Sequence, residues 1–130
     1  MISKDRIFQA YYTKSTPIVS YMVDLLNLKG NEKIFEPCAG DGVFIASILD
    51  LHKHATIDAF ELNIDSYQKL RNKYSNFDSV KIKQTDTLTD IDLEFSCSMD
   101  GGIYDAVIAN PPYGAWRNTK ERKKEIKKKI

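Results

Sequence analysis

The feature of this 130-residue chain that most constrains its fold is the even spacing of four polar residues. They lie 25, 25 and 24 positions apart, and each closes a short apolar, strand-like run: Glu36, Glu61, Asp86 and Asn110. In an open parallel sheet, each strand–helix unit takes roughly 25 to 30 residues. Ligands bind such a sheet in the crevice outside the carboxyl ends of its strands. The spacing therefore predicts an α/β fold with polar side chains along one edge of a parallel sheet.

Apolar patterns between these positions alternate between helical and extended periodicity. This alternation is typical of a parallel sheet with right-handed crossovers. Residues 86–102 have no clear period and are expected to form a loop or one short helical turn. The expected elements are helices over 16–28, 43–51 and 65–74 and strands over 33–36, 56–62, 80–84 and 104–109.

Composition indicates one globular domain and excludes several other classes. The chain is 42% hydrophobic and 28% charged, which is ordinary usage for a folded domain. No apolar stretch approaches the roughly 18 residues of a membrane span, and the amino terminus lacks an export signal. We therefore expect a cytoplasmic protein without a membrane partner. Cys38 and Cys97 lie in unrelated contexts, which argues against a disulfide framework and against a metal site.

The net charge of +1 conceals a strongly basic end. Residues 117–130 carry eight Lys or Arg and two Glu. Such a segment can contact phosphates, but it also has the composition of an ordinary solvated helix. We expect one domain over 1–116 and a basic, helical tail over 117–130, where the sequence stops without a helix cap.

A glycine turn follows the first expected strand and precedes a helix. Gly40 and Gly42 let the backbone approach a ligand and aim the helix amino terminus at it. The third glycine of the dinucleotide fingerprint is missing, so binding of the NAD kind is not favoured. Glu61 is placed to accept hydrogen bonds from ribose hydroxyls, and Leu62 beside it could pack on adenine. Asp86 could accept from the adenine amine, because an ionised carboxylate is an acceptor only.

The most specific motif is Asn110-Pro111-Pro112-Tyr113. Two consecutive prolines cannot continue a strand, so they form a stiff turn at the sheet edge. The Asn110 side-chain carbonyl and the Pro111 backbone carbonyl are two acceptors, and Tyr113 offers an aromatic face. Together they suit a planar amine whose ring stacks on the tyrosine.

These motifs resemble those of adenine-N6 DNA methyltransferases that use S-adenosylmethionine, of the kind found in type II and IIS restriction-modification systems. The resemblance runs through the chain to about residue 117 and covers the amino-terminal, cofactor-binding part of such an enzyme. It implies a partial Rossmann-like methyltransferase fold with sheet order 3-2-1-4. The matching segments, in the family's order, are 11–17, 36–44, 61–63, 86–88 and 110–113.

The resemblance also implies roles for individual residues. Tyr12 and Thr13 would contact the methionine carboxylate of the cofactor. The catalytic set would be Asn110, Pro111, Pro112 and Tyr113, holding the N6 amine of a flipped adenine for direct in-line transfer. The implied cofactor-binding set is Tyr12, Thr13, Glu36, Pro37, Cys38, Ala39, Gly40, Gly42, Phe44, Glu61, Leu62, Asp86, Thr87, Leu88 and Asn110.

The same resemblance implies partners. The substrate would be DNA, bound through a carboxy-terminal recognition region that this sequence lacks, and a cognate restriction endonuclease is a second expected partner. Without the recognition region, the chain alone is expected to be inactive.

Three alternatives stay open. The same tetrapeptide methylates RNA bases or a release-factor glutamine in other methyltransferases. The chain could instead bind S-adenosylmethionine without transferring the methyl group, as a fragment or as a subunit that needs a partner. A dehydrogenase-like nucleotide domain is the third alternative, although it leaves 110–113 unexplained.

Overall fold

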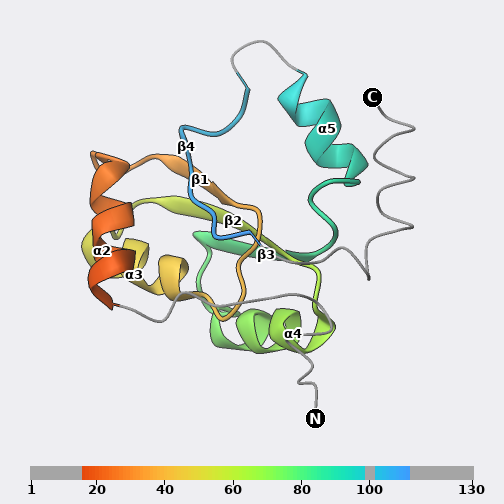
Figure 1. Ribbon diagram of the computed structural model, residues 1–130, viewed down its shortest axis with the longest axis horizontal. Coiled ribbons are helices and arrows are strands. Elements are labelled where there is room, and N and C mark those ends of the chain that lie inside the picture. Colours follow the sequence, from red (N-terminus) through yellow and green to blue (C-terminus); the bar gives the residue numbers. More distant parts are fainter. Residues whose placement is uncertain (1–15, 99–101, 112–130) are drawn as a thin grey trace.

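One parallel sheet organises the molecule (Figure 1). The computed structural model describes residues 16–98 and 102–111. Within them, four strands pair in the order β3-β2-β1-β4, which confirms the predicted order 3-2-1-4. The strands are β1 Lys33–Glu36, β2 Thr56–Glu61, β3 Val80–Gln84 and β4 Ala106–Val107.

The pairing register brings the strand ends to a common edge. Every pair is parallel, and Glu36 lies opposite Ala59 while Glu61 lies opposite Gln84. Beyond β4, the amide of Ile108 donates to the carbonyl of Phe35 at 3.1 Å. The polar residues at 25-residue intervals therefore follow neighbouring strands, as their spacing predicted.

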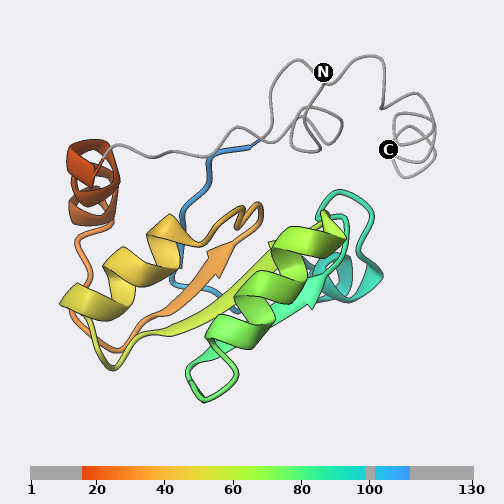
Figure 2. The same ribbon diagram turned by 90° about the horizontal axis from the view of Figure 1, so that it is seen from below.

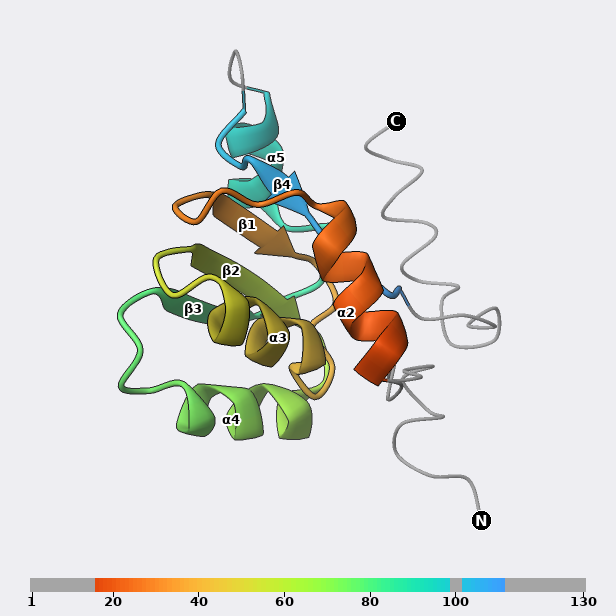
Figure 3. The same ribbon diagram turned by 90° about the vertical axis from the view of Figure 1, so that its left-hand side faces the viewer.

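Four helices are described, and they cover the two faces of the sheet unequally. Helices α3 and α4 lie side by side on one face, with α2 beside α3, whereas α5 lies on the other face (Figures 2 and 3). The α2–α4 side buries most of the core. The helices are α2 Thr16–Leu25, α3 Val43–Leu51, α4 Ile64–Lys73 and α5 Ile91–Cys97.

Helix α3 is the central element of the core because it is apolar on nearly every side. Its Phe44, Ile45 and Ile48 are fully buried and share one cluster with Ile34 of β1 and Ile57 of β2. Burying each such side chain stabilises the fold by about 1.5–3 kcal/mol. This cluster holds the glycine turn, which directly precedes α3, against the sheet.

Three expected segments differ from the structure by more than one residue. Helix α2 ends at Leu25 rather than residue 28. The amides of Leu26 and Asn27 bond to carbonyls three residues back instead of four, and Asn27 is left-handed (φ 51°). Strand β4 comprises only two residues of the six expected. Residues 86–102 contain a seven-residue helix, α5, because the Asp90 side chain caps it by accepting from the amide of Leu93.

The predicted basic tail, 117–130, lies outside the described residues. Within the described ranges, none of the helices has the length and apolarity that a membrane span requires. The same ranges hold no group of three His, Cys, Asp or Glu side chains that could bind a metal ion.

Candidate functional site

The glycine turn between β1 and α3 has two residues in the left-handed region. Gly40 has φ 59° and Gly42 has φ 84°, a region that side-chain-bearing residues rarely adopt. The amide of Gly42 donates to the carbonyl of Ala39 at 2.9 Å, and the carbonyl of Gly42 accepts from the amide of Ala46. A Cβ on Gly42 would approach Leu70 Cδ2 to 2.6 Å. The turn thus needs glycine for its backbone and for its packing, and it leads directly into the amino terminus of α3.

Glu61, the last residue of β2, braces this turn from the neighbouring strand. Glu61 is buried (7% exposed), and its Oε1 accepts from the amide of Gly40 at 2.8 Å. Oε2 accepts from the amide of Asn63 at 2.7 Å. Asn63 in turn caps α4 by accepting from the amide of Ser66. An ionised carboxylate is an acceptor only, so this position at the strand end suits a ligand that offers hydroxyl donors.

Glu36, the last residue of β1, is the most buried polar group in the described part of the chain. It is 0% exposed, and neither carboxyl oxygen has a hydrogen-bond partner there. Burial, followed by the negative charges of Asp41 and Glu61, raises the pKa of Glu36 well above its ordinary value. The Tyr74 hydroxyl is also buried without a hydrogen-bond partner in these ranges. Burial and then the charge of Glu36 raise the pKa of Tyr74 as well.

The loop after β3 is tied to the glycine turn. Thr87 Oγ1 donates to the carbonyl of Pro37 at 2.6 Å, a bond between residues 50 positions apart. Asp86 Oδ1 accepts from the amide of Leu88 at 3.0 Å, which forms a tight local turn. The side chain of Leu88 itself is exposed. The structure therefore brings this loop to the same edge of the sheet as the glycine turn.

A cluster that the sequence did not predict anchors the other end of this loop. The Asp90 carboxylate, buried at the start of α5, accepts from Lys83 Nζ at 2.8 Å and from Thr85 Oγ1 at 2.7 Å. Burial alone would raise the pKa of Asp90, but the bonds from Lys83, the Leu93 amide and Thr85 outweigh it and lower the pKa to about 2. The signal in the sequence was the pattern of Asp90 followed by Asp92 and Glu94, which favours a helix start.

The remaining predicted residues fall into three groups. Asn110 is half-buried beyond the end of β4, and Pro111 is exposed. Ala39 and Phe44 are buried in the core, while Cys38 and Leu62 are half-buried in the turns after β1 and β2. The predicted residues Tyr12, Thr13, Pro112 and Tyr113 lie outside the described residues.

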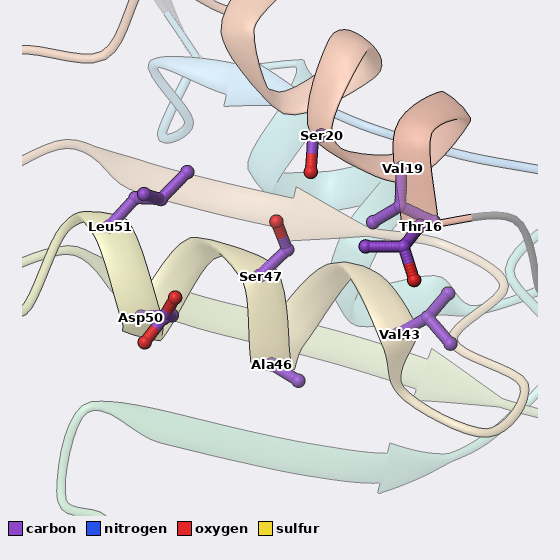
Figure 4. Close-up of a pocket in the computed structure, with 8 residues that line it drawn as sticks. All are labelled: Thr16, Val19, Ser20, Val43, Ala46, Ser47, Asp50 and Leu51. Atoms are coloured by element: carbon purple, nitrogen blue, oxygen red, sulfur yellow. The ribbon is translucent and has the colours of Figure 1, made fainter.

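A hollow of about 480 Å³ lies elsewhere, between α2 and α3 (Figure 4). Val19 and Ser20 of α2 point toward α3, and Ser47 points back toward α2. Of its described lining residues, Val43 lies next to the predicted site, between Gly42 and Phe44. The lining residues are Thr16, Val19, Ser20, Val43, Ala46, Ser47, Asp50 and Leu51.

The sheet order and the helix arrangement define the chain as a partial Rossmann-like methyltransferase fold. An RNA methyltransferase from Salinibacter ruber, solved with S-adenosyl-L-homocysteine, aligns with TM-score 0.63 at 17% identity over 85% of this chain and 68% of that one. TrmN from Thermus thermophilus aligns with TM-score 0.63 at 17% identity, over 87% of this chain and 33% of that one. At these identities the similarity shows the fold alone.

The family follows from sequence. The model of the Eco57I restriction-modification methylase family matches residues 4–130, and the chain belongs to that family. It is 31% identical over 131 residues to the type II methyltransferase M.HincII of Haemophilus influenzae, and 29% identical over 89 residues to M.AccI of Acinetobacter calcoaceticus. These matches cover 98% and 68% of this chain but only 22% and 15% of the relatives. The chain thus spans about a fifth of the length of M.HincII.

Proposed function

We propose that this chain is the cofactor-binding and catalytic-motif part of a restriction-modification DNA methyltransferase that methylates the N6 amine of adenine. Family membership supports the reaction class, since the relatives M.HincII and M.AccI are type II methyltransferases. The single observation that carries the assignment is the Glu61 carboxylate, which lies at the sheet edge and holds the amide of Gly40. A nucleoside cofactor is bound at this place in such folds.

S-adenosylmethionine is the proposed cofactor, and it would supply an electrophilic methyl group on a sulfonium. Glu61, which also holds the amides of Gly40 and Asn63, would accept from its ribose hydroxyls. Asp86 would accept from the adenine amine, and Leu62 would pack on the adenine ring. Gly40 and Gly42 leave room for close approach to the backbone.

The acceptors after β4 are proposed to hold the substrate amine. The Asn110 side-chain carbonyl and the Pro111 backbone carbonyl would accept the two hydrogens of the adenine amine, while Tyr113 stacks on the extruded base. With its hydrogens held, the amine directs its lone pair away from ring conjugation and toward the methyl donor. Positioning of this kind provides most of the rate enhancement that such a site needs. The proton that leaves the methylated nitrogen passes to solvent.

Titration calorimetry tests the cofactor assignment. We expect S-adenosylmethionine to bind the folded chain, Glu61→Ala and Asp86→Ala to weaken binding, and NAD not to compete. Asp92→Ala is the matched control, because Asp92 is an exposed carboxylate on α5 that pairs with Lys83. Absence of binding by a chain with a native circular dichroism spectrum would contradict the proposal.

Identification of the methylated product tests the substrate. We expect a longer protein that contains this chain to produce N6-methyladenine in DNA, and Asn110→Ala to abolish transfer while it weakens cofactor binding less than Glu61→Ala does. RNA and a release-factor peptide serve as competing substrates. We also expect residues 1–130 alone to bind the cofactor without methylating DNA, because the relatives are several times longer.

A further inference from the structure

Glu36 has an unusual place for a carboxyl group. It ends β1 directly before the glycine turn, is 0% exposed, and has no hydrogen-bond partner for either oxygen in the described part of the chain. An ionised carboxylate in such surroundings would lack both water and donors, which costs several kcal/mol. Burial without donors therefore favours the protonated, neutral carboxyl, which is the direction of its raised pKa.

The charged groups that act on Glu36 are both negative. Asp41 lies in the glycine turn and Glu61 ends the neighbouring strand, and each opposes ionisation of Glu36. From α4, the facing group is Tyr74, whose buried hydroxyl is a neutral phenol with a raised pKa. Three carboxyl groups are thus gathered around the turn that the proposed cofactor would approach, and one of them is held neutral.

We propose that Glu36 is a specificity determinant for positive charge: capture of a cationic cofactor at the glycine turn is coupled to loss of the Glu36 proton to solvent. The inference rests on the proposed function, since it takes S-adenosylmethionine as the ligand. Glu36 already has no exposed surface, so a ligand above the turn adds little further desolvation. The remaining effect of a sulfonium cation is to stabilise the carboxylate.

Because of this coupling, the site should bind the substrate form of the cofactor more tightly than the product form. S-adenosylmethionine carries the sulfonium charge, whereas S-adenosylhomocysteine has a neutral thioether in its place. Ionised Glu36 attracts the first more than the second. Binding of S-adenosylmethionine should therefore strengthen as pH rises toward the pKa of free Glu36, and the preference over S-adenosylhomocysteine should widen in the same direction.

Calorimetry in buffers of different ionisation enthalpy measures the proton release directly. For the wild-type chain at about pH 7, we expect S-adenosylmethionine to release a measurable fraction of a proton, and S-adenosylhomocysteine to release less. Glu36→Gln imitates the protonated acid and should abolish this difference. Glu32→Gln is the control, because that carboxylate is not buried and accepts from the amides of Lys29 and Gly30. Protons exchanged by the ligand's own amine are common to all three proteins and cancel.

A second measurement covers the case in which Glu36→Gln does not fold. The ¹³C shift of the Glu36 side-chain carboxyl in the wild-type chain should report the protonated form alone and move toward the ionised form with S-adenosylmethionine. Binding without proton release, or an unchanged carboxyl shift, would overturn this inference and leave the proposed function standing. Absence of binding by a folded chain would overturn both.

Discussion

The carboxyl ends of the four strands form one edge of the sheet, and its two halves differ in the bonds that fix them. One half lies after β1 and β2, and the other lies after β3 and β4. At β1 and β2, the Glu61 carboxylate is buried and binds the backbone on both sides, at Gly40 and at Asn63. At β3 and β4, support is thinner: β4 has two residues, and Val107 is 56% exposed. The half proposed to hold the ribose is therefore organised before any ligand arrives. The half proposed to hold the adenine amine and the substrate is joined to the rest through the bond from Thr87 to Pro37 and through the bonds of Asp90 to Lys83 and Thr85.

The largest expected effect comes from Gly42→Ala, in the firmer half. The new Cβ would occupy a left-handed backbone (φ 84°) and approach Leu70 Cδ2 to 2.6 Å. Since Leu70 is buried in the core and cannot turn away freely, we expect a loss of about 3 kcal/mol in the free energy of unfolding. Urea denaturation measures it.

Gly102→Ala is the matched control for this change. Gly102 also has positive φ (62°), but a Cβ added there would meet no atom within 4 Å. Only backbone strain of about 1 kcal/mol is expected at this position. Equal losses at the two glycines would show that close packing of the turn on α4 contributes nothing.

Glu61→Ala should have the next largest effect. It leaves two backbone amides of the buried edge without their acceptor, at Gly40 and Asn63, so we expect a loss of about 2 kcal/mol in unfolding free energy. Glu32→Ala removes the same kind of double acceptor from the amides of Lys29 and Gly30, where water can replace it. Chemical denaturation measures the loss in unfolding free energy for both variants. A larger loss for Glu32→Ala than for Glu61→Ala would contradict the prediction that burial makes the Glu61 bonds more important.

Sequence reasoning predicted the features that depend on neighbouring residues or on a repeated unit. The glycine turn lies between a strand and a helix, as expected from Gly40 and Gly42. The sheet order 3-2-1-4 is the one implied by the resemblance to methyltransferases. Sequence reasoning did not predict that Glu36 would be buried without a hydrogen-bond partner among the described residues. That property depends on how α4 and Tyr74 pack, and Tyr74 carries no local signal of such a role. The Thr87–Pro37 bond, across 50 positions, was equally invisible in the sequence.

Low pH should lower the free energy of unfolding by protonating Asp90, in the half of the edge after β3 and β4. Its folded pKa of about 2 lies below the ordinary 3.8, so the unfolded chain binds more protons between these values. The stabilisation is complete above about pH 4 and is lost as pH falls toward 2, by about 1–2 kcal/mol because Lys83 is partly solvated. Acid unfolding followed by circular dichroism measures it. Asp90→Asn should flatten this part of the profile, whereas Asp92→Asn should not, and identical profiles for the two variants would exclude the assignment.

The smallest expected effect concerns the bond that joins the two halves. Thr87→Val keeps the shape of the side chain but removes the hydroxyl that donates to the carbonyl of Pro37, so we expect a loss of about 1 kcal/mol in unfolding free energy. Thr87→Ser keeps the donor and should lose less. If the bond positions the Asp86 loop, Thr87→Val should also weaken S-adenosylmethionine binding, and that weakening should disappear in an Asp86→Ala background. A binding loss that persists in this background would mean that Thr87 acts on the glycine turn, and that the two halves of the edge are not linked through Asp86.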